Sequence, residues 1–308
     1  MQATIVMYHY VRPIKNSRFP GIKGLEASDF EEQVSYFKKH NAIVSLNDVY
    51  DAIYSGGALH PNALLLTFDD GYLDHYQYAL PVLEKHKIKG CFYPPLCAVR
   101  ERKMLSVNKI HFILSSAPAA EIAAFINQEI DKTGKPSARY LANLDLSSRF
   151  DTKEVIYVKR MLQRELPEDF REKLITQLFA RYVSQDEKAF AEQLYLSEAQ
   201  IKEMKSLGHH IGSHGSRHYW LSRLTSDEQR KDIAQTKDFL MGLGEQILSF
   251  CYPYGDYNDD TLNILKEFNF SIGLSTKLGA ADLKGNPLTL ARFDTNDFPK
   301  DKNAPAPR

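Results

Sequence analysis

Ala63-Leu64-Leu65-Leu66-Thr67-Phe68 is a continuous, mainly apolar run of strand length, and Asp69-Asp70-Gly71-Tyr72 follows it directly. Such a run is typical of a strand whose two faces are both buried, as in a parallel sheet. Ligands bind at the carboxyl ends of strands in parallel α/β folds. The two adjacent carboxylates therefore mark a candidate site, and capping of the following helix is the alternative role for them.

Short β-rich runs alternate with helical patterns on both sides of this strand. The expected strands are residues 3–8, 42–45, 63–68, 90–93, 210–213, 247–252, 271–274 and 288–293. Helical patterns follow several of them, over residues 28–39, 48–54, 72–86, 197–207 and 259–268. Because a repeated β-α order favours a parallel sheet or barrel, we expect an α/β fold with about seven β-α units.

The β-α order breaks between residues 104 and 195, where apolar residues recur at helical spacing among many charges. We interpret this stretch as an all-helical insertion and a possible lid. Residues 1–103 and 196–295 then form the barrel as one discontinuous domain. Residues 296–308 are polar and Pro-rich, so we expect a flexible tail.

The composition excludes several classes of partner. The chain has 308 residues with 39 Lys+Arg and 39 Asp+Glu, a balance that argues against nucleic-acid and anionic-membrane partners. No stretch approaches the ~18 apolar residues of a membrane helix, and the first residues do not read as a leader peptide, which favours a cytoplasmic protein. The three cysteines form no C-x-x-C pair, so any metal is expected to serve chemistry rather than structure.

Two further polar motifs follow other expected strands. His214 and His218 lie four residues apart, and two neutral imidazoles at this spacing can share one cation, although surface or packing roles are equally common. Phe250-Cys251-Tyr252-Pro253-Tyr254-Gly255 ends another strand, where these residues could also simply close the barrel mouth. Because all three motifs stand at strand ends, we expect them to meet on one rim of the barrel.

In their order, Asp69-Asp70-Gly71, His214-Gly215-Ser216-Arg217-His218 and Tyr252-Pro253-Tyr254-Gly255 resemble the motifs of the polysaccharide deacetylases, carbohydrate esterase family 4 with its NodB-homology domain. The resemblance covers roughly residues 1–100 and 196–293. It implies a distorted (β/α)7 barrel, here with a helical insertion, and a metal-dependent N-deacetylase site at the barrel's C-terminal mouth.

The resemblance also implies roles for individual residues. Asp70, His214 and His218 would bind a divalent metal, with zinc first and cobalt, nickel or iron left open. Asp69 would be the catalytic base, and the backbone N–H of Tyr254 would help to hold the oxyanion. The chemistry of these side chains agrees, since two imidazoles and one carboxylate leave an open position for water in a catalytic zinc site.

The chain departs from the family pattern at two places. Cys251 stands where the family usually has an Arg that steadies the base, and no His follows His218 to serve as the general acid. A branch resembling the poly-N-acetylglucosamine deacetylases carries its acid His on the first strand, like Tyr8-His9 here. We therefore expect His9 to be the acid, with a buried structural His as the alternative, because first and last strands are neighbours in a closed barrel.

The sequence also suggests places for two other residues, Arg292 and His75. Arg292, on the last expected strand, is our candidate to replace the missing Arg, and a surface ion pair is the alternative. His75, one helical turn past the Asp pair, is expected on the helix surface or in support of the site, and not as a metal ligand.

The predicted function is removal of an N-acetyl or other small acyl group from an amino sugar in surface-glycan biosynthesis. The substrate would be a nucleotide-linked, lipid-linked or oligosaccharide amino sugar. Two alternatives stay open: a catalytically impaired sugar-binding barrel, and an amidohydrolase or deformylase that acts on a different acyl amide. The sugar, the acyl group and the oligomeric state are not specified by the sequence.

Overall fold

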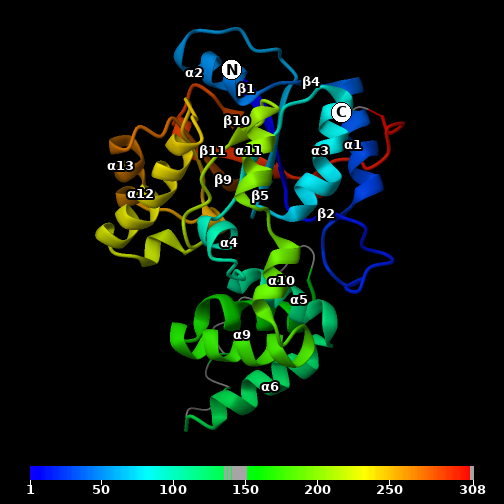
Figure 1. The fold of residues 1–308 in the computed structure, drawn as a ribbon, viewed down its shortest axis with the longest axis vertical. Helices are drawn as coiled ribbons and strands as arrows, with labels where there is room; N and C mark the ends of the chain where they lie inside the picture. The colour runs from blue at the N-terminus through cyan, green and yellow to red at the C-terminus, as the bar shows by residue number, and fades with distance from the viewer. Residues whose placement is uncertain (135–136, 138–139, 141–150, 306–308) are drawn as a thin grey trace. The chain divides into compact units, whose positions relative to one another are not determined.

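The chain divides into two compact units, each containing more than one segment of the sequence. The computed structural model describes residues 1–134, 137, 140 and 151–305. The first unit comprises Met1–Pro13, Gly24–Lys103 and Glu192–Arg308, and the second comprises Ile14–Lys23 and Met104–Ala191. Figure 1 shows strands surrounded by helices in the first unit and helices in the second.

A curled parallel sheet forms the centre of the first unit. Its strands are β1 (Gln2–Tyr8), β5 (Ala63–Asp69), β6 (Cys91–Tyr93), β7 (His210–Ile211), β8 (Ser249–Cys251), β9 (Ile272–Leu278) and β11 (Leu290–Asp294). They are ordered β7-β6-β5-β1-β11-β9-β8, with every neighbouring pair parallel. A parallel bridge between Ser213 and Phe250 joins the two ends of this order. The described strands therefore close as the expected distorted (β/α)7 barrel.

Helices cover the outside of this barrel (Figure 1). They are α1 (Ala27–His40), α2 (Leu46–Tyr54), α3 (Leu80–His86), α4 (Leu96–Arg100), α11 (Glu198–Ser206), α12 (Ser226–Gly242) and α13 (Asp259–Glu267). A π-helical turn, η1 (His75–Ala79), precedes α3. Short strands lie beside the barrel: β4 (Ala42–Ile43) pairs with β5, β10 (Ala281–Asp282) pairs with β1, and β2 (Val11–Arg12) pairs with β3 (Leu25–Glu26).

Both faces of β5 are buried because each packs in a different apolar cluster. All seven of its residues are buried, as its apolar run predicts. Leu64, Leu66 and Phe68 pack in a cluster with side chains of α1, α3 and α12. Ala63 and Leu65 pack in a second cluster with side chains of β6, β8 and β9. Since side chains alternate along a strand, Thr67 and Asp69 continue the inward-facing series to the barrel mouth.

Gly212 lets the chain after β7 pass close to its neighbours. A Cβ atom at this position would lie 2.2 Å from Tyr93 Cε1 and 2.6 Å from Ser249 Oγ. Both neighbours are buried inside the barrel. The absence of a side chain is therefore what allows this turn to reach the mouth with His214 at its end.

Gly212→Ala is expected to lower the free energy of unfolding by about 1–3 kcal/mol or more, because the added methyl group overpacks the barrel. Urea unfolding measures the change. Gly242→Ala is the matched control, since a Cβ atom there meets nothing within 4 Å. It should be neutral or slightly stabilising. Equal stability of the two variants would show that the contact at Gly212 is relieved by small shifts.

The second unit is helical. It contains α5 (Ser106–Ser116), α6 (Ala119–Asp131), α8 (Lys153–Arg160), α9 (Glu168–Tyr182) and most of α10 (Glu187–Leu194), with a π-helical turn, η2 (Met161–Glu165), after α8. Residues 141–150 of the predicted insertion lie outside the described residues. Residues 14–23, which we expected in the barrel, belong to this unit. The ring of Phe19 packs edge-on against Phe112 and Phe190, and Arg18 donates a hydrogen bond to the Val183 carbonyl.

Most of the segment expected to be a flexible tail packs against α1. Phe298 packs edge-on against Phe37 of α1 at 5.1 Å between ring centroids, and the Tyr36 hydroxyl donates to the Pro305 carbonyl. The Gln33 side-chain amide donates to the carbonyls of Thr295 and Pro299. Residues 306–308 lie outside the described residues. Within the part of the chain that the structure describes, no helix is both long and apolar enough to cross a membrane.

Candidate functional site

The turn after β5 carries both adjacent carboxylates into one buried region. Asp69 is the last residue of β5, and Asp70 follows with a φ of 69°. Non-glycine residues seldom adopt this left-handed conformation, and its presence is typical of functional turns. Gly71 also has a positive φ, and a Cβ atom on it would lie 2.6 Å from Pro94 Cβ. The strained turn lets two successive side chains face the same buried region instead of opposite faces of the strand.

The loop after β7 carries the two histidines. Asp232 of α12 accepts hydrogen bonds from the backbone N–H groups of Ser216 and Arg217, at 2.8 and 2.9 Å. His218 then has a φ of 57°, a second left-handed residue at the site. This folded loop brings the rings of His214 and His218 to 4.8 Å between centroids, and both are buried. The structure therefore brings together the two histidines singled out by their spacing.

Three side chains converge on one point, as expected for a metal site. Nε2 of His214 lies 3.3 Å and Nε2 of His218 lies 3.4 Å from Oδ1 of Asp70. A tetrahedral zinc ion with bonds of about 2.0–2.1 Å separates its ligand atoms by about 3.3–3.4 Å. The donor set and its spacing therefore fit a divalent cation held by Asp70, His214 and His218.

Neighbouring groups orient two of these three ligands. Nδ1 of His214 lies 2.7 Å from the Cys251 carbonyl oxygen, which can only accept, so Nδ1 carries the proton and Nε2 keeps its lone pair for a cation. The Tyr72 hydroxyl donates to Asp70 Oδ2 at 2.5 Å. Only Oδ1 of Asp70 therefore faces the histidines. Supporting hydrogen bonds of this kind are usual around protein metal ligands.

Asp69 forms a buried ion pair with Arg292. The guanidinium donates to both carboxylate oxygens at 2.9 and 2.8 Å, and also to Thr67 Oγ1 and the Ser275 carbonyl. Burial would raise the pKa of Asp69, but the guanidinium charge and hydrogen bonds prevail and lower that pKa to about 2. The structure thus places Arg292 against the predicted base, in place of a surface ion pair.

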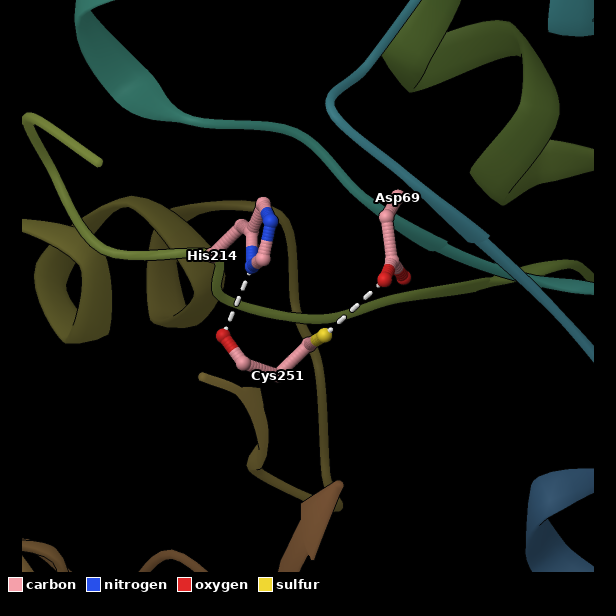
Figure 2. Close-up of side chains that lie close together, drawn as sticks. All are labelled: Asp69, His214 and Cys251. Atoms are coloured by element: carbon pink, nitrogen blue, oxygen red, sulfur yellow. Dashed lines mark hydrogen bonds between the residues drawn. The ribbon is translucent and has the colours of Figure 1, made fainter. Parts of the chain in front are cut away.

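Cys251, which stands at the sequence position of the missing Arg, lies in the same network. Figure 2 shows its carbonyl directed toward His214 and its sulfur toward Asp69. The thiol donates to Asp69 Oδ2 at 3.3 Å, and Arg292 donates to the sulfur at 3.1 Å. Asp69, His214 and Cys251 could by proximity form a second cation site. Two features disfavour a cation there. The Arg292 guanidinium already neutralises Asp69, and burial raises the pKa of the Cys251 thiol, so the thiol stays protonated.

His9 lies one residue beyond β1, on the same rim. β1 pairs with β5 on one side and with β11 on the other, so His9 stands between the strands that carry Asp69 and Arg292. Its side chain is half-buried. This place on the rim puts His9 beside the turn that carries Asp69 and Asp70.

Tyr254 is placed by a third left-handed turn, with a φ of 59° inside η4 (Pro253–Gly255). Its ring stacks on Trp220 at 4.2 Å and meets the edge of His218 at 4.7 Å. The oxyanion role of its backbone N–H stays a prediction. The two stacked rings add an aromatic surface next to the candidate ligands.

Several supporting residues were not predicted as parts of the site. Tyr72 could have been included, since it ends the Asp69-Asp70-Gly71-Tyr72 run. Asp232 is a buried acid on the inner face of α12, and Asp74 and His75 are buried at the start of η1. Buried polar residues at helical positions of this kind give no distinct signal in a single sequence. For His75, burial excludes the helix surface and leaves the supporting role.

Comparisons with known proteins agree with this fold. The sequence profile of the family described as polysaccharide deacetylase matches residues 56–99 and 174–273, which include Asp69, Asp70, His214, His218 and Tyr254. YxkH of Bacillus subtilis (strain 168), a protein assigned to the polysaccharide deacetylases, is 33% identical over 95 residues. That alignment spans 30% of this chain and 34% of YxkH, about a third of each.

Solved structures show the same architecture over nearly the whole chain. The Streptococcus pyogenes deacetylase PplD, in complex with acetate, has a TM-score of 0.60 at 20% identity and is aligned over 96% of this chain and 92% of its own. IcaB from Ammonifex degensii has a TM-score of 0.59 at 20% identity, over 96% and 91%. At these identities the likenesses establish the fold.

The barrel has the fold of PplD and IcaB, and three buried Asp and His side chains converge at its mouth. With the matching sequence profile over just under half of its residues, this chain resembles the polysaccharide deacetylase family.

Proposed function

We propose that this protein is a metal-dependent hydrolase that removes an N-acetyl or other small acyl group from an amino sugar. The observation that carries the proposal is the pair of carboxylates with different surroundings at one turn. Asp70 faces two imidazoles at metal-ligand spacing, whereas Asp69 is kept ionised by Arg292. One carboxylate is thus suited to hold a cation and the other to accept a proton.

Zinc is the cation we expect at Asp70, His214 and His218, because two imidazoles and one carboxylate form a catalytic zinc set that leaves a position open. A bound cation would supply Lewis-acid polarisation of the substrate carbonyl and would make a water more acidic. Cobalt, nickel and iron share much of this ligand preference. Metal analysis of the purified protein distinguishes them.

The residues of the chain supply the proton transfers. Asp69 accepts a proton from the attacking water as the new carbon–oxygen bond forms. His9 then donates a proton to the sugar nitrogen as the carbon–nitrogen bond breaks, which releases a carboxylic acid and a free amine. Asp69 then loses its proton to solvent and His9 regains one, so both residues return to their starting states. Arg292 keeps Asp69 ionised and correctly oriented, and the Tyr254 backbone N–H is proposed to stabilise the oxyanion.

An acetylated amino sugar is the proposed substrate, either within an oligosaccharide or linked to a nucleotide or lipid. Two observations support it. The stacked rings of Trp220 and Tyr254 offer an apolar face next to the ligands, of the kind that packs against a sugar ring. Among proteins of the same fold, PplD is a deacetylase whose structure holds acetate.

His9→Ala is expected to lower the turnover number for an N-acetylated sugar about 10²–10⁴-fold, because the leaving nitrogen loses its proton donor. The metal content should not change, since His9 is not among the three convergent ligands. Steady-state kinetics and metal analysis on the same preparation measure both quantities. His60→Ala, at an exposed histidine of the same unit, is the control. Undiminished turnover of His9→Ala would remove His9 from the mechanism.

The proposal as a whole is tested by acetate release from a panel of acylated sugars, measured on protein of known metal content. The panel contains N-acetylglucosamine oligomers, a nucleotide-linked N-acetylhexosamine and an N-formyl sugar. Release of acetate from a sugar supports the proposal. Release of formate alone would favour a deformylase, and a metal-loaded protein that binds these sugars without any release would favour a sugar-binding barrel.

A further inference from the structure

The segment that carries His9 is fastened to the turn that carries Asp69 and Asp70. The ladder between β1 and β5 ends where Tyr8 lies opposite Phe68, so His9 is already beyond it. Beyond the ladder, three contacts hold residues 9–12 against the residues that follow the Asp pair. They come from Tyr72, Asp74 and His75, which directly follow the Asp pair in the sequence.

The first contact is made by His75 on the backbone of His9 itself. His75 is fully buried, and its Nε2 lies 2.8 Å from the His9 carbonyl oxygen. Burial lowers the pKa of His75 to about 4, so the ring is neutral at neutral pH. Because a carbonyl can only accept, the proton must be on Nε2. Nδ1 is also buried and has no hydrogen-bond partner among the described residues, so packing alone is a poor reason for a histidine here.

The other two contacts hold the residues that follow His9. Arg12 donates to both carboxylate oxygens of Asp74 at 2.6 Å, and both side chains are mostly buried. The ring of Tyr10 stacks on Tyr72 with 4.1 Å between centroids. Tyr72 in turn donates to Asp70. His9 is therefore held by the ladder before it, by these contacts after it, and by its own carbonyl.

We propose that His75 and Asp74 are positioning residues that set the place of the His9 imidazole relative to the Asp69-Asp70 turn. This inference rests on the proposed function, in which His9 protonates the leaving nitrogen. A proton donor must lie within hydrogen-bond reach of its target, and a displacement of about 1 Å at a reacting group can cost about 100-fold in rate. Holding the donor segment against this turn keeps the donor, the base and the candidate ligand Asp70 in one rigid body.

The variant that tests this is His75→Phe, which keeps an aromatic ring among Phe68, Tyr72 and Phe92 and removes the hydrogen bond to His9. His75→Gln is the conservative partner, because its side-chain amide can still donate. Asp74→Asn breaks the ion pair with Arg12 independently. Glu267→Gln, in the exposed bidentate pair with Arg230, is the matched control remote from the site.

Two substrates separate positioning from a general structural effect. Acetate release from N-acetylglucosamine oligomers needs the proton donor, whereas p-nitrophenyl acetate needs none because p-nitrophenolate leaves as an anion. His75→Phe and Asp74→Asn should lower amide turnover about 10–100-fold while ester hydrolysis and metal content stay within about threefold of the unmodified protein. His75→Gln should recover most of the amide activity. Equal losses on both substrates, or no loss on either, would overturn the inference.

A measurement that does not depend on turnover keeps the two proposals distinguishable. The probe is carbethoxylation of His9 by diethyl pyrocarbonate, followed by mass spectrometry. The rate should be at least about threefold higher in His75→Phe and Asp74→Asn than in the unmodified protein and Glu267→Gln. The reason is that a segment with fewer contacts opens more often and exposes the imidazole. Unchanged reactivity of His9 would overturn the positioning role. Failure of the metal-loaded unmodified protein to release any acyl group would overturn the proposed function instead.

Discussion

Arg292→Gln is expected to lower the free energy of unfolding of the metal-free protein by about 3–5 kcal/mol at neutral pH, because breaking a buried ion pair leaves an uncompensated charge. The partner left behind is Asp69, whose side chain is 2% exposed. Urea unfolding of chelator-treated protein measures the change. Arg230→Gln, which breaks an exposed bidentate pair with Glu267, is the matched control and should give no measurable change.

The pH dependence of this variant identifies Asp69 as the cause. In the unmodified protein the pKa of Asp69 falls from its ordinary value of 3.8 to about 2 on folding, so its stabilising contribution is present above about pH 4 and is lost as the pH falls toward 2. Without Arg292, burial raises this pKa above 3.8, and the folded variant takes up a proton that the unfolded chain does not. The stability difference between the two proteins should therefore shrink from about pH 7 to about pH 4. A constant difference would contradict this assignment.

The second large effect is expected for the base. Asp69→Asn should lower turnover about 10²–10⁴-fold, because the amide cannot accept a proton from water. The single variant also leaves Arg292 buried without its counter-charge, so lost stability could mimic lost catalysis. The double variant Asp69→Asn/Arg292→Gln removes both charges and should be more stable than either single variant.

The double variant therefore separates catalysis from stability. Its metal content should equal that of the unmodified protein, since Asp70, His214 and His218 are unchanged. Its turnover should stay as low as that of Asp69→Asn. Recovery of turnover together with stability would mean that Asp69 serves the fold and not the reaction.

The sequence predicted the parts of the site that follow from local patterns. The apolar run before Asp69-Asp70-Gly71 marks a strand buried on both faces, and its alternation carries Asp69 inward. His214 and His218 are recognisable by their spacing at another strand end. Arg292 was a candidate because it lies on the last expected strand, and the structure places its guanidinium 2.8 Å from Asp69. The bidentate pair between Arg292 and Asp69 and the hydrogen bond from the Cys251 thiol to Asp69 join residues far apart in the sequence. No local sequence pattern predicts such contacts.

Two features that the sequence did not predict have the same origin. Residues 14–23 carry no marked pattern, and only the packing of Phe19 against Phe112 and Phe190 assigns them to the helical unit. The C-terminal segment has the composition of a frayed end, yet a single aromatic contact between Phe298 and Phe37 and the polar side chain of Gln33 hold it against α1. Tertiary contacts of this kind place a segment whose local composition alone would predict no fixed structure.

Stepwise zinc addition to chelator-treated protein, with acetate release measured at each step, tests the central claim most directly. Activity should be absent without metal and should rise in proportion to bound zinc until one ion per chain, the number that Asp70, His214 and His218 can hold together. Asp70→Asn should bind zinc far more weakly and should not recover activity over the same range. Full acetate release from metal-free protein, or undiminished zinc-dependent release by Asp70→Asn, would contradict the account.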